Sequence, residues 1–262
     1  DLGYEADFID LAEMGKHKLR GYYAAAKRIN PAISIAKAAR TLPDALKAVR
    51  YIDEMEGRVR LDRGFERQRG SMKAVFDTFL QEISSAKNRK SLDAAYQKAS
   101  AALSAVALDK PETPLRVGIV GEYYTVMDDF GNHNVEQILG YMGRGVEIHR
   151  WMTFTHRNLE YDEQADLQTI APYVRYSMGP TTSATLAGAI RYADAGFDGI
   201  VHVKSFGCTP EVDAMAVLQN ISADRGIPIL YLSYDSQTGD AGIQTRLEAF
   251  YDMIDMKRRK QP

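Results

Sequence analysis

Short apolar runs alternate with helical segments from residue 114 onward, and this alternation restricts the folds that the chain can adopt. The apolar runs cover residues 115–121, 146–152, 197–203 and 227–234, and residues 135–143, 182–196, 210–226 and 241–257 have helical spacing. Continuous apolar strands separated by helices of this length are typical of a parallel sheet that is covered on both faces. We therefore predict an α/β domain over residues 113–262, with about four parallel strands and helices on both faces.

The preceding region, residues 1–112, has no convincing strand and is predicted to be helical. Apolar residues recur every three to four positions over 72–83 and 92–108, a spacing that gives a helix one apolar face. Ser91 is the expected N-cap of the second helix, because a serine hydroxyl accepts a backbone hydrogen bond at a helix start. Pro31 and Pro43 predict breaks, since proline disfavours helical geometry in the residue before it. We expect these helices to pack together or to wrap around a partner.

Composition excludes several classes of protein. Lys and Arg number 33 and Asp and Glu number 35, so the net charge of −2 indicates no basic surface for nucleic acid or an anionic membrane. No apolar run approaches the roughly 18 residues of a membrane span. The single cysteine rules out an internal disulfide and fits a reducing compartment, so we expect a cytoplasmic protein. Because the chain begins at Asp1 without a methionine, we also expect it to be a fragment of a longer protein.

That cysteine, Cys208, follows the apolar run 197–203 and precedes a helix. In a parallel sheet this is the edge where ligands bind. Thr209 is the expected N-cap, Pro210 the first helical residue and Gly226 the stop. A helix N-terminus favours a thiolate, which attacks electrophiles or binds metal, although Glu211 in the first turn opposes it. The alternative is that the cysteine is simply a small buried hydrophobic residue.

Other polar residues follow the predicted strands. Thr181, Thr182 and Ser183 offer three hydroxyls at a helix start, where a phosphate or carboxylate can dock, although plain N-capping also explains one of them. Lys204 lies four residues before the cysteine and is placed to neutralise an anion or a thiolate. These four residues are the candidate cofactor-binding residues.

The loops after the first and last strands contain residues that we interpret mainly as structural. Asn134, with Gln137 three residues later, resembles a capping box. Asp240 is the expected N-cap of the last helix. His133 has no partner at metal-ligand spacing, which indicates a solvated loop histidine rather than a metal site.

Three segments resemble a known family: VGIVGEYYTVMDDFGNHNVEQILG (117–140), HVKSFGCTPEVDAM (202–215) and IPILYLSYDSQTGDAGIQTRLEAFYDMI (227–254). The chain resembles the D-component family of 2-hydroxyglutaryl-CoA dehydratases over about residues 113–255. More closely, it resembles the C-terminal part of acyl-CoA dehydratase activase-related proteins. The resemblance implies a flavodoxin- or Rossmann-like sheet and an iron–sulfur role.

The resemblance also implies what the cysteine does. Family members hold a [4Fe–4S]-type cluster with cysteines from more than one domain and use one-electron chemistry on acyl-CoA thioesters, and Cys208 corresponds to one such ligand. Clusters of this type need about four ligands, so the others would come from an upstream α/β domain or a partner subunit, and this fragment alone would hold no cluster. Thr181, Thr182, Ser183 and Lys204 would contact cluster-bound or CoA-type ligands. The resemblance further implies that the helical region, residues 1–112, joins two α/β domains. A homo-oligomer is also compatible with this region.

Two other functions stay open. Cys208 could be the nucleophile of a thiol enzyme, with His202 or His133 as its base; the period of two along a strand places His202 on the same face as Lys204. Alternatively, the chain could be a non-catalytic module that binds a ligand or partner at the edge of its sheet.

Overall fold

The computed structural model describes residues 18–260, and its centre is a four-stranded parallel sheet with the order β2-β1-β3-β4. The strands are β1 (Leu115–Gly121), β2 (Val146–Arg150), β3 (Gly199–Ser205) and β4 (Ile229–Tyr234). In the register, Val117 of β1 faces Ile148 of β2 and Gly199 of β3. The predicted α/β class and all four strands are confirmed.

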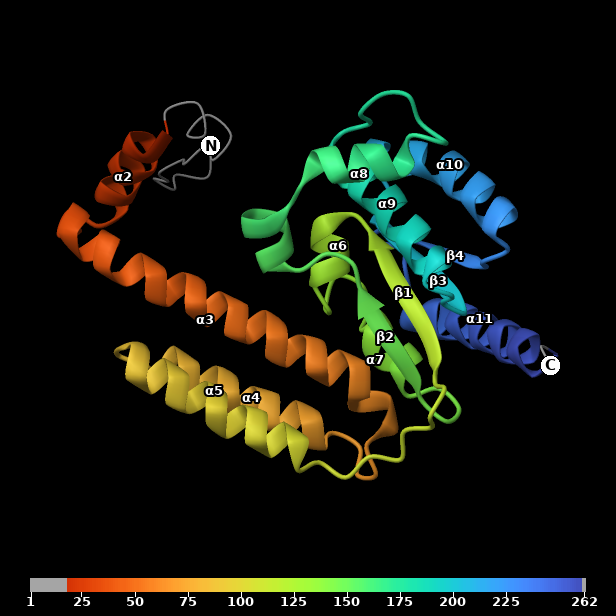
Figure 1. Ribbon diagram of the computed structural model, residues 1–262, viewed down its shortest axis with the longest axis horizontal. Coiled ribbons are helices and arrows are strands. Elements are labelled where there is room, and N and C mark those ends of the chain that lie inside the picture. The colour runs from red at the N-terminus through yellow and green to blue at the C-terminus, as the bar shows by residue number, and fades with distance from the viewer. Residues whose placement is uncertain (1–17, 261–262) are drawn as a thin grey trace. The chain divides into compact units, whose positions relative to one another are not determined.

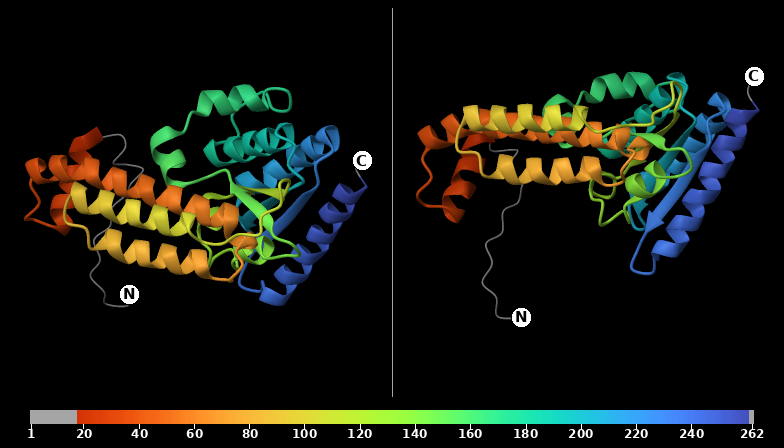
Figure 2. Two further views of the ribbon diagram at one scale, coloured as in Figure 1. Left: turned by 60° about the horizontal axis from the view of Figure 1, so that its bottom comes forward. Right: turned by 90° about the horizontal axis from the view of Figure 1, so that it is seen from below.

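Helices cover both faces of this sheet (Figure 1), and each face has its own apolar core. The first core contains side chains from α6 (Tyr123–Met127), α7 (Val135–Gly140) and α11 (Asp240–Arg259). The second contains side chains from α8 (Glu163–Ile170), α9 (Pro180–Asp194) and α10 (Thr209–Arg225). Figure 2 shows α9 and α11 on opposite sides of the strands. Helices that follow β1 and β4 therefore lie on one face, and those that follow β2 and β3 on the other.

Strand side chains alternate between the two cores, as expected for a sheet buried on both faces. Along β3, Val201 and Val203 enter the first core and Ile200 enters the second. Gly118 of β1 faces the second core, and a Cβ there would lie 2.2 Å from the ring of Tyr192. The missing side chain lets the tyrosine ring of α9 pack directly on the strand.

The helical part begins with α2 (Lys18–Ile29) and α3 (Ile35–Asp62), followed by η1 (Arg63–Phe65), α4 (Ser71–Ser84) and α5 (Arg89–Ser104). The described chain divides into two compact units between Ala48 and Val49, so α4 and α5 belong to the unit that contains the sheet. A boundary near residue 112 stays a prediction. Among residues 18–260, no helix is both long enough and apolar enough to cross a membrane.

Two sequence predictions about these helices are wrong. Pro43 lies inside α3 instead of ending it; proline removes one backbone hydrogen bond, but the neighbouring turns continue the helix. Ser91 is not the N-cap of α5, because Asn88 holds that position and its side chain accepts from the N–H of Ser91 at 3.0 Å. The serine hydroxyl accepts from the N–H of Asn88 at 3.1 Å, and this second hydrogen bond completes a capping box.

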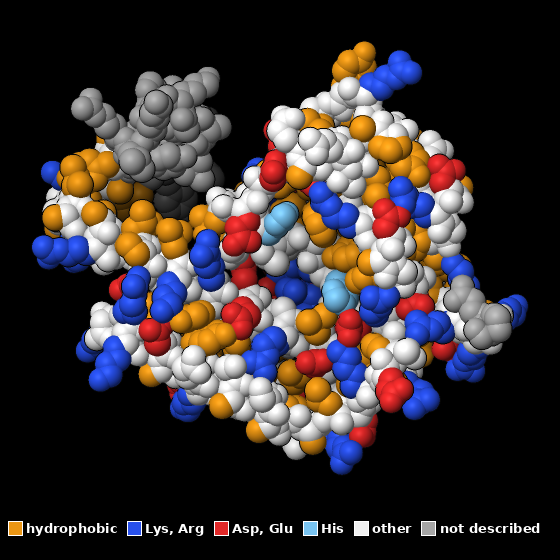
Figure 3. Space-filling view, in the orientation of Figure 1, with side chains coloured by type: hydrophobic (Ala, Val, Ile, Leu, Met, Phe, Trp, Pro, Cys, Tyr) orange, Lys and Arg blue, Asp and Glu red, His pale blue; other side chains and the backbone are white. Residues whose placement is uncertain are grey.

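A buried group of charges joins the end of α3 to the sheet. Arg60 of α3 donates from Nε to Glu136 of α7 at 3.0 Å, and Arg150 at the end of β2 lies 3.5 Å from the same carboxylate. Glu56 pairs with both arginines from the side of α3. The side chains of Arg60, Glu136 and Arg150 are no more than 5% exposed. These charges are therefore stabilised by pairing with one another instead of by hydration. By contrast, charges of both signs are mixed over the face drawn in Figure 3.

Substituting Glu136 by Gln should destabilise the chain strongly. Burial alone would raise the pKa of Glu136, but the neighbouring arginines outweigh it and hold this pKa below 4.5. Its stabilising contribution is therefore present above about pH 4.5 and is lost as the pH falls through the lower, folded-state pKa. Removing one member of a buried charge group costs about 3–5 kcal/mol, so we expect a loss of that order in the free energy of unfolding at pH 7, measured by urea denaturation.

A matched control is Asp77→Asn, which removes an exposed ion pair between Asp77 and Lys73. Exposed pairs contribute about 0–1 kcal/mol, so this variant should unfold like the parent. If Glu136→Gln and Asp77→Asn lowered the free energy of unfolding equally, the buried charges would contribute no more to stability than an exposed pair.

Candidate functional site

The carboxyl ends of β1 and β3 lie side by side and form the topological switch point of the sheet. The connection after β1 leads to β2 on one side, whereas the connection after β3 leads to β4 on the other. Ligands of open parallel sheets bind in the crevice that this divergence leaves. Gly121 ends β1 at φ +139°, where a Cβ would lie 1.9 Å from the carbonyl oxygen of Val203. The N–H of Glu122 donates to that oxygen at 2.9 Å, so the ends of the two strands are held together.

Cys208 follows β3 at this switch point and is the N-cap of α10. The prediction of Thr209 as the cap is wrong by one residue, because Thr209 already has helical geometry and Pro210 is the second residue of the helix. Proline is accepted in the first turn, where its missing N–H has no partner in any case. Gly226 ends the helix at φ +62°, as predicted.

Burial raises the pKa of the Cys208 thiol above its ordinary value. The backbone N–H of Glu211 lowers this pKa, the carboxylates of Glu211 and Glu122 raise it, and the ammonium of Lys204 lowers it. The side chain is partly exposed. The expected stabilisation of a thiolate by the helix N-terminus is therefore not the net effect here, because desolvation and two carboxylates outweigh it.

Lys204 carries a buried positive charge beside this thiol. Its side chain lies on the α9–α10 face of β3, and the residue is 3% exposed. The ammonium donates only to the backbone carbonyls of Ser205, at 3.3 Å, and Phe206, at 3.1 Å. None of the ion pairs found in residues 18–260 involves Lys204. A buried charge without a counter-ion is costly, so the switch point contains a positive charge that an anion would stabilise.

The three predicted hydroxyls lie at the start of α9, but they have different surroundings. Thr182 and Ser183 are fully buried, whereas Thr181 is partly exposed. The hydroxyl of Thr182 donates to the carbonyl of Pro210 at 2.9 Å and so ties α9 to the start of α10. The Ser183 hydroxyl has no partner. None of them caps the helix, since the N-cap is Gly179 without a side-chain hydrogen bond.

His202, the expected base of a thiol enzyme, is instead part of a buried hydrogen-bond chain. Its Nε2 lies 2.8 Å from Oε2 of Glu211, and the hydroxyl of Thr185 donates to the other carboxylate oxygen at 3.1 Å. All three residues are at most 2% exposed. The role of Glu211 was missed in the sequence, where it counted only as a charge opposing the thiolate. A histidine in a buried strand, which needs a partner, was the available signal.

His133 pairs with Asp240 at 2.5 Å and stacks on the ring of Tyr234 with 5.6 Å between ring centres. It is therefore not a solvated loop histidine. Asn134 is the N-cap of α7, but its backbone is left-handed (φ +58°) and its side chain makes no capping hydrogen bond, so the expected capping box does not form. The prediction of Asp240 as an N-cap is wrong, because it is the first helical residue after the N-cap Gly239. At the start of α7, the side chain of Asn132 accepts instead from the N–H of Val135 at 3.2 Å.

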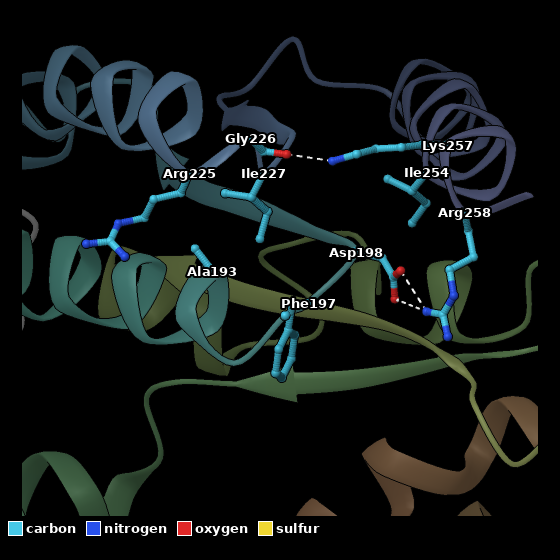
Figure 4. A pocket seen from close by; sticks show the side chains of 10 residues that line it. Ala193, Phe197, Asp198, Arg225, Gly226, Ile227, Ile254, Lys257 and Arg258 are labelled. Carbon is cyan, nitrogen blue, oxygen red and sulfur yellow. Dashed lines mark hydrogen bonds and ion pairs between the residues drawn. The ribbon is translucent and has the colours of Figure 1, made fainter. Parts of the chain in front are cut away.

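A cavity of about 230 Å³ lies at the opposite, amino edge of the sheet (Figure 4). Its charged residues are already paired: Arg258 bonds Asp198 at 2.7 Å, and Lys257 donates to the carbonyl of Gly226 at 2.5 Å. These basic groups satisfy loop carbonyls and acids near the ends of the helices. The cavity is therefore not the candidate site, which we place at the carboxyl edge.

The structure thus brings Cys208, Lys204 and the buried hydroxyl of Thr182 to one edge, where Glu122 and Glu211 join them. This part of the chain provides one cysteine and no metal cage of its own: in residues 18–260, no group of three or more His, Cys, Asp or Glu side chains could hold a metal ion.

The raised pKa of Cys208 can be measured directly, because this is the only thiol in the chain. We expect the rate of alkylation by iodoacetamide to rise with pH with a midpoint above the usual thiol value of about 8.5. Lys204→Gln should move the midpoint higher, because it removes the charge that favours the thiolate. The exposed Lys73→Gln is the control and should leave the midpoint unchanged. A midpoint below that of a free thiol would contradict this description.

Comparison with known proteins agrees with this fold. Residues 115–254 match the family model described as 2-hydroxyglutaryl-CoA dehydratase, D-component. The match begins at β1, ends inside α11 and spans more than half of the 262 residues. A search of curated proteins found no match, and the closer resemblance to activase-related proteins stays a prediction. On the family match, the chain belongs to the 2-hydroxyglutaryl-CoA dehydratase D-component family.

Proposed function

We propose that this chain is a component of a 2-hydroxyacyl-CoA dehydratase-related protein and that Cys208 supplies one thiolate to a [4Fe–4S]-type cluster. The observation that carries the proposal is the position of the only cysteine at the switch point of the sheet, partly exposed and beside a buried ammonium without a counter-ion. Family membership supports the relation to the dehydratases. The cluster would supply one-electron chemistry on acyl-CoA thioesters.

The residues of this chain fit one ligand position but not a whole cluster. Clusters of this type are held by about four ligands, chiefly cysteine thiolates, and the sequence has one cysteine. The other ligands would come from a neighbouring α/β domain or a partner subunit facing the carboxyl edge. Cys208 has partial access to solvent, which such a shared position requires.

The positive charge of Lys204 would stabilise the negative charge of the cluster. A thiolate-ligated cluster carries negative charge, and the ammonium of Lys204 is held near Cys208 by the carbonyls of Ser205 and Phe206. A fixed positive charge would favour the deprotonated sulfur that metal binding requires. The raised pKa of the free thiol would then be overcome by the metal, which displaces the proton.

The geometry gives less support to a thiol-nucleophile enzyme. Such an enzyme needs a base within hydrogen-bond reach of an activated sulfur. Here burial raises the pKa of Cys208, His202 is bonded to Glu211, and His133 is paired with Asp240.

The test compares Cys208→Ser with the parent chain, each assembled with its neighbouring domain or partner subunit and purified without oxygen. We expect the parent assembly to contain about four irons and four labile sulfides per cluster. The variant should lose at least one iron or the whole cluster, with a changed electron paramagnetic resonance spectrum. Ser236→Ala, an exposed position in the loop after β4, is the control. A full iron content together with an unchanged electron paramagnetic resonance spectrum in the Cys208→Ser assembly would remove the proposal.

A further inference from the structure

Five side chains form a continuous aromatic cluster at the carboxyl ends of β1 and β2: Tyr123, Trp151, His156, Arg157 and Tyr161. The guanidinium of Arg157 lies over two rings, 4.6 Å from the centre of Tyr123 and 5.4 Å from that of Tyr161. The His156 ring is 6.2 Å from Tyr161 and 5.4 Å from Trp151. His156 and Arg157 begin η2 (His156–Glu160), a single π-helical turn. Such turns are frequent at functional sites.

Four polar atoms of the aromatic cluster are shielded from solvent and have no hydrogen-bond partner among residues 18–260. They are Oη of Tyr123, Nε1 of Trp151, Nε2 of His156 and Nε of Arg157. Most buried polar groups in proteins are bonded, so four unbonded atoms in one cluster require an explanation. The indole and guanidinium N–H groups can only donate. A partner for these two groups must therefore be a hydrogen-bond acceptor, whereas the tyrosine hydroxyl and the histidine ring nitrogen can either donate or accept.

The cluster also carries one unpaired positive charge. No ion pair within the described part of the chain involves Arg157. The neighbouring Arg191 lies 4.7 Å from the ring centre of Trp151 and pairs with Oδ1 of Asp166 at 2.6 Å. Oδ2 of Asp166 is also buried without a partner among the described residues, so a donor is missing there. Burial and nearby acids raise the pKa of Tyr161 to about 12, so this phenol is neutral at physiological pH.

The geometry points to a binding site for the carboxylate group of a small organic anion. A carboxylate matches the planar fork of an arginine and accepts from several donors at once. Its single charge balances Arg157, whereas a phosphate dianion would exceed that charge and would be repelled more strongly by Asp166, which faces Tyr161 and His156 of the cluster. The rings offer apolar walls for the rest of the molecule. All five residues are partly exposed, so a ligand can approach from solvent.

The site does not depend on the proposed cluster, because it uses neither Cys208 nor iron. The alternative occupant is ordered water, which also satisfies buried polar atoms. Water would fill the same positions in every buffer, whereas a carboxylate site would respond to added carboxylate and saturate.

The test uses Trp151, the only tryptophan in the chain, as a fluorescent reporter inside the site. The full chain is titrated with sodium butyrate, with butyramide as the uncharged analogue and sodium chloride as the salt control. We expect a saturable change in tryptophan fluorescence with butyrate alone. Arg157→Gln should weaken binding about tenfold or more, because a charge-assisted hydrogen-bonded pair is lost. Arg157→Lys keeps the positive charge but loses the planar guanidinium. Its affinity for butyrate should therefore lie between that of the parent and that of Arg157→Gln.

Arg175→Gln is the matched control, because Arg175 is exposed and lies outside the aromatic cluster. It should bind butyrate like the parent. Three results would overturn the proposal: no saturable response to butyrate, as expected of water alone; parental affinity in an Arg157→Gln variant whose circular dichroism is native; or binding of inorganic phosphate in preference to butyrate.

Discussion

The parallel pairing of β1 with β3 is the interaction on which the candidate site depends. Because these neighbouring strands lead to opposite sides of the sheet, their carboxyl ends form a crevice. The close approach of Gly121 to Val203 holds this crevice together, since any side chain at Gly121 would separate the two backbones. Cys208 is positioned as a consequence: the turn after β3 and the start of α10 place it at that crevice.

The same part of the molecule combines groups that are individually unfavourable to bury. Among residues 18–260, the hydrogen-bond partners of Lys204 are carbonyls only, and the Ser183 hydroxyl and Nδ1 of His202 have no hydrogen-bond partner. A carboxylate, Glu211, is fully enclosed. Natural sequences keep such groups mostly where function requires them. The apolar cores on the two faces stabilise the strands strongly enough to tolerate this arrangement at one edge.

The strands and the longer helices of the sheet could be predicted because their apolar spacing follows directly from burial on two faces. Helix starts were less predictable. At Asn88, Cys208 and Gly239 the true cap lies one to three residues before the expected one, because a cap depends on the path of the preceding loop. A histidine in a buried strand indicated that His202 needs a partner, but not that the partner is Glu211. The aromatic cluster around Arg157 could not be predicted, since it joins segments whose approach is decided by tertiary packing.

The buried charges that join α3 to the sheet also determine which solvents the molecule can tolerate. Dissolved salt screens exposed charges over a Debye length of about 10 Å at 0.1 M ionic strength, but it screens charges that are closed off from water much less. The Arg60–Glu136–Arg150 group is closed off in this way. Concentrated salt should therefore leave this junction intact, whereas acid, which neutralises the central carboxylate, would open it.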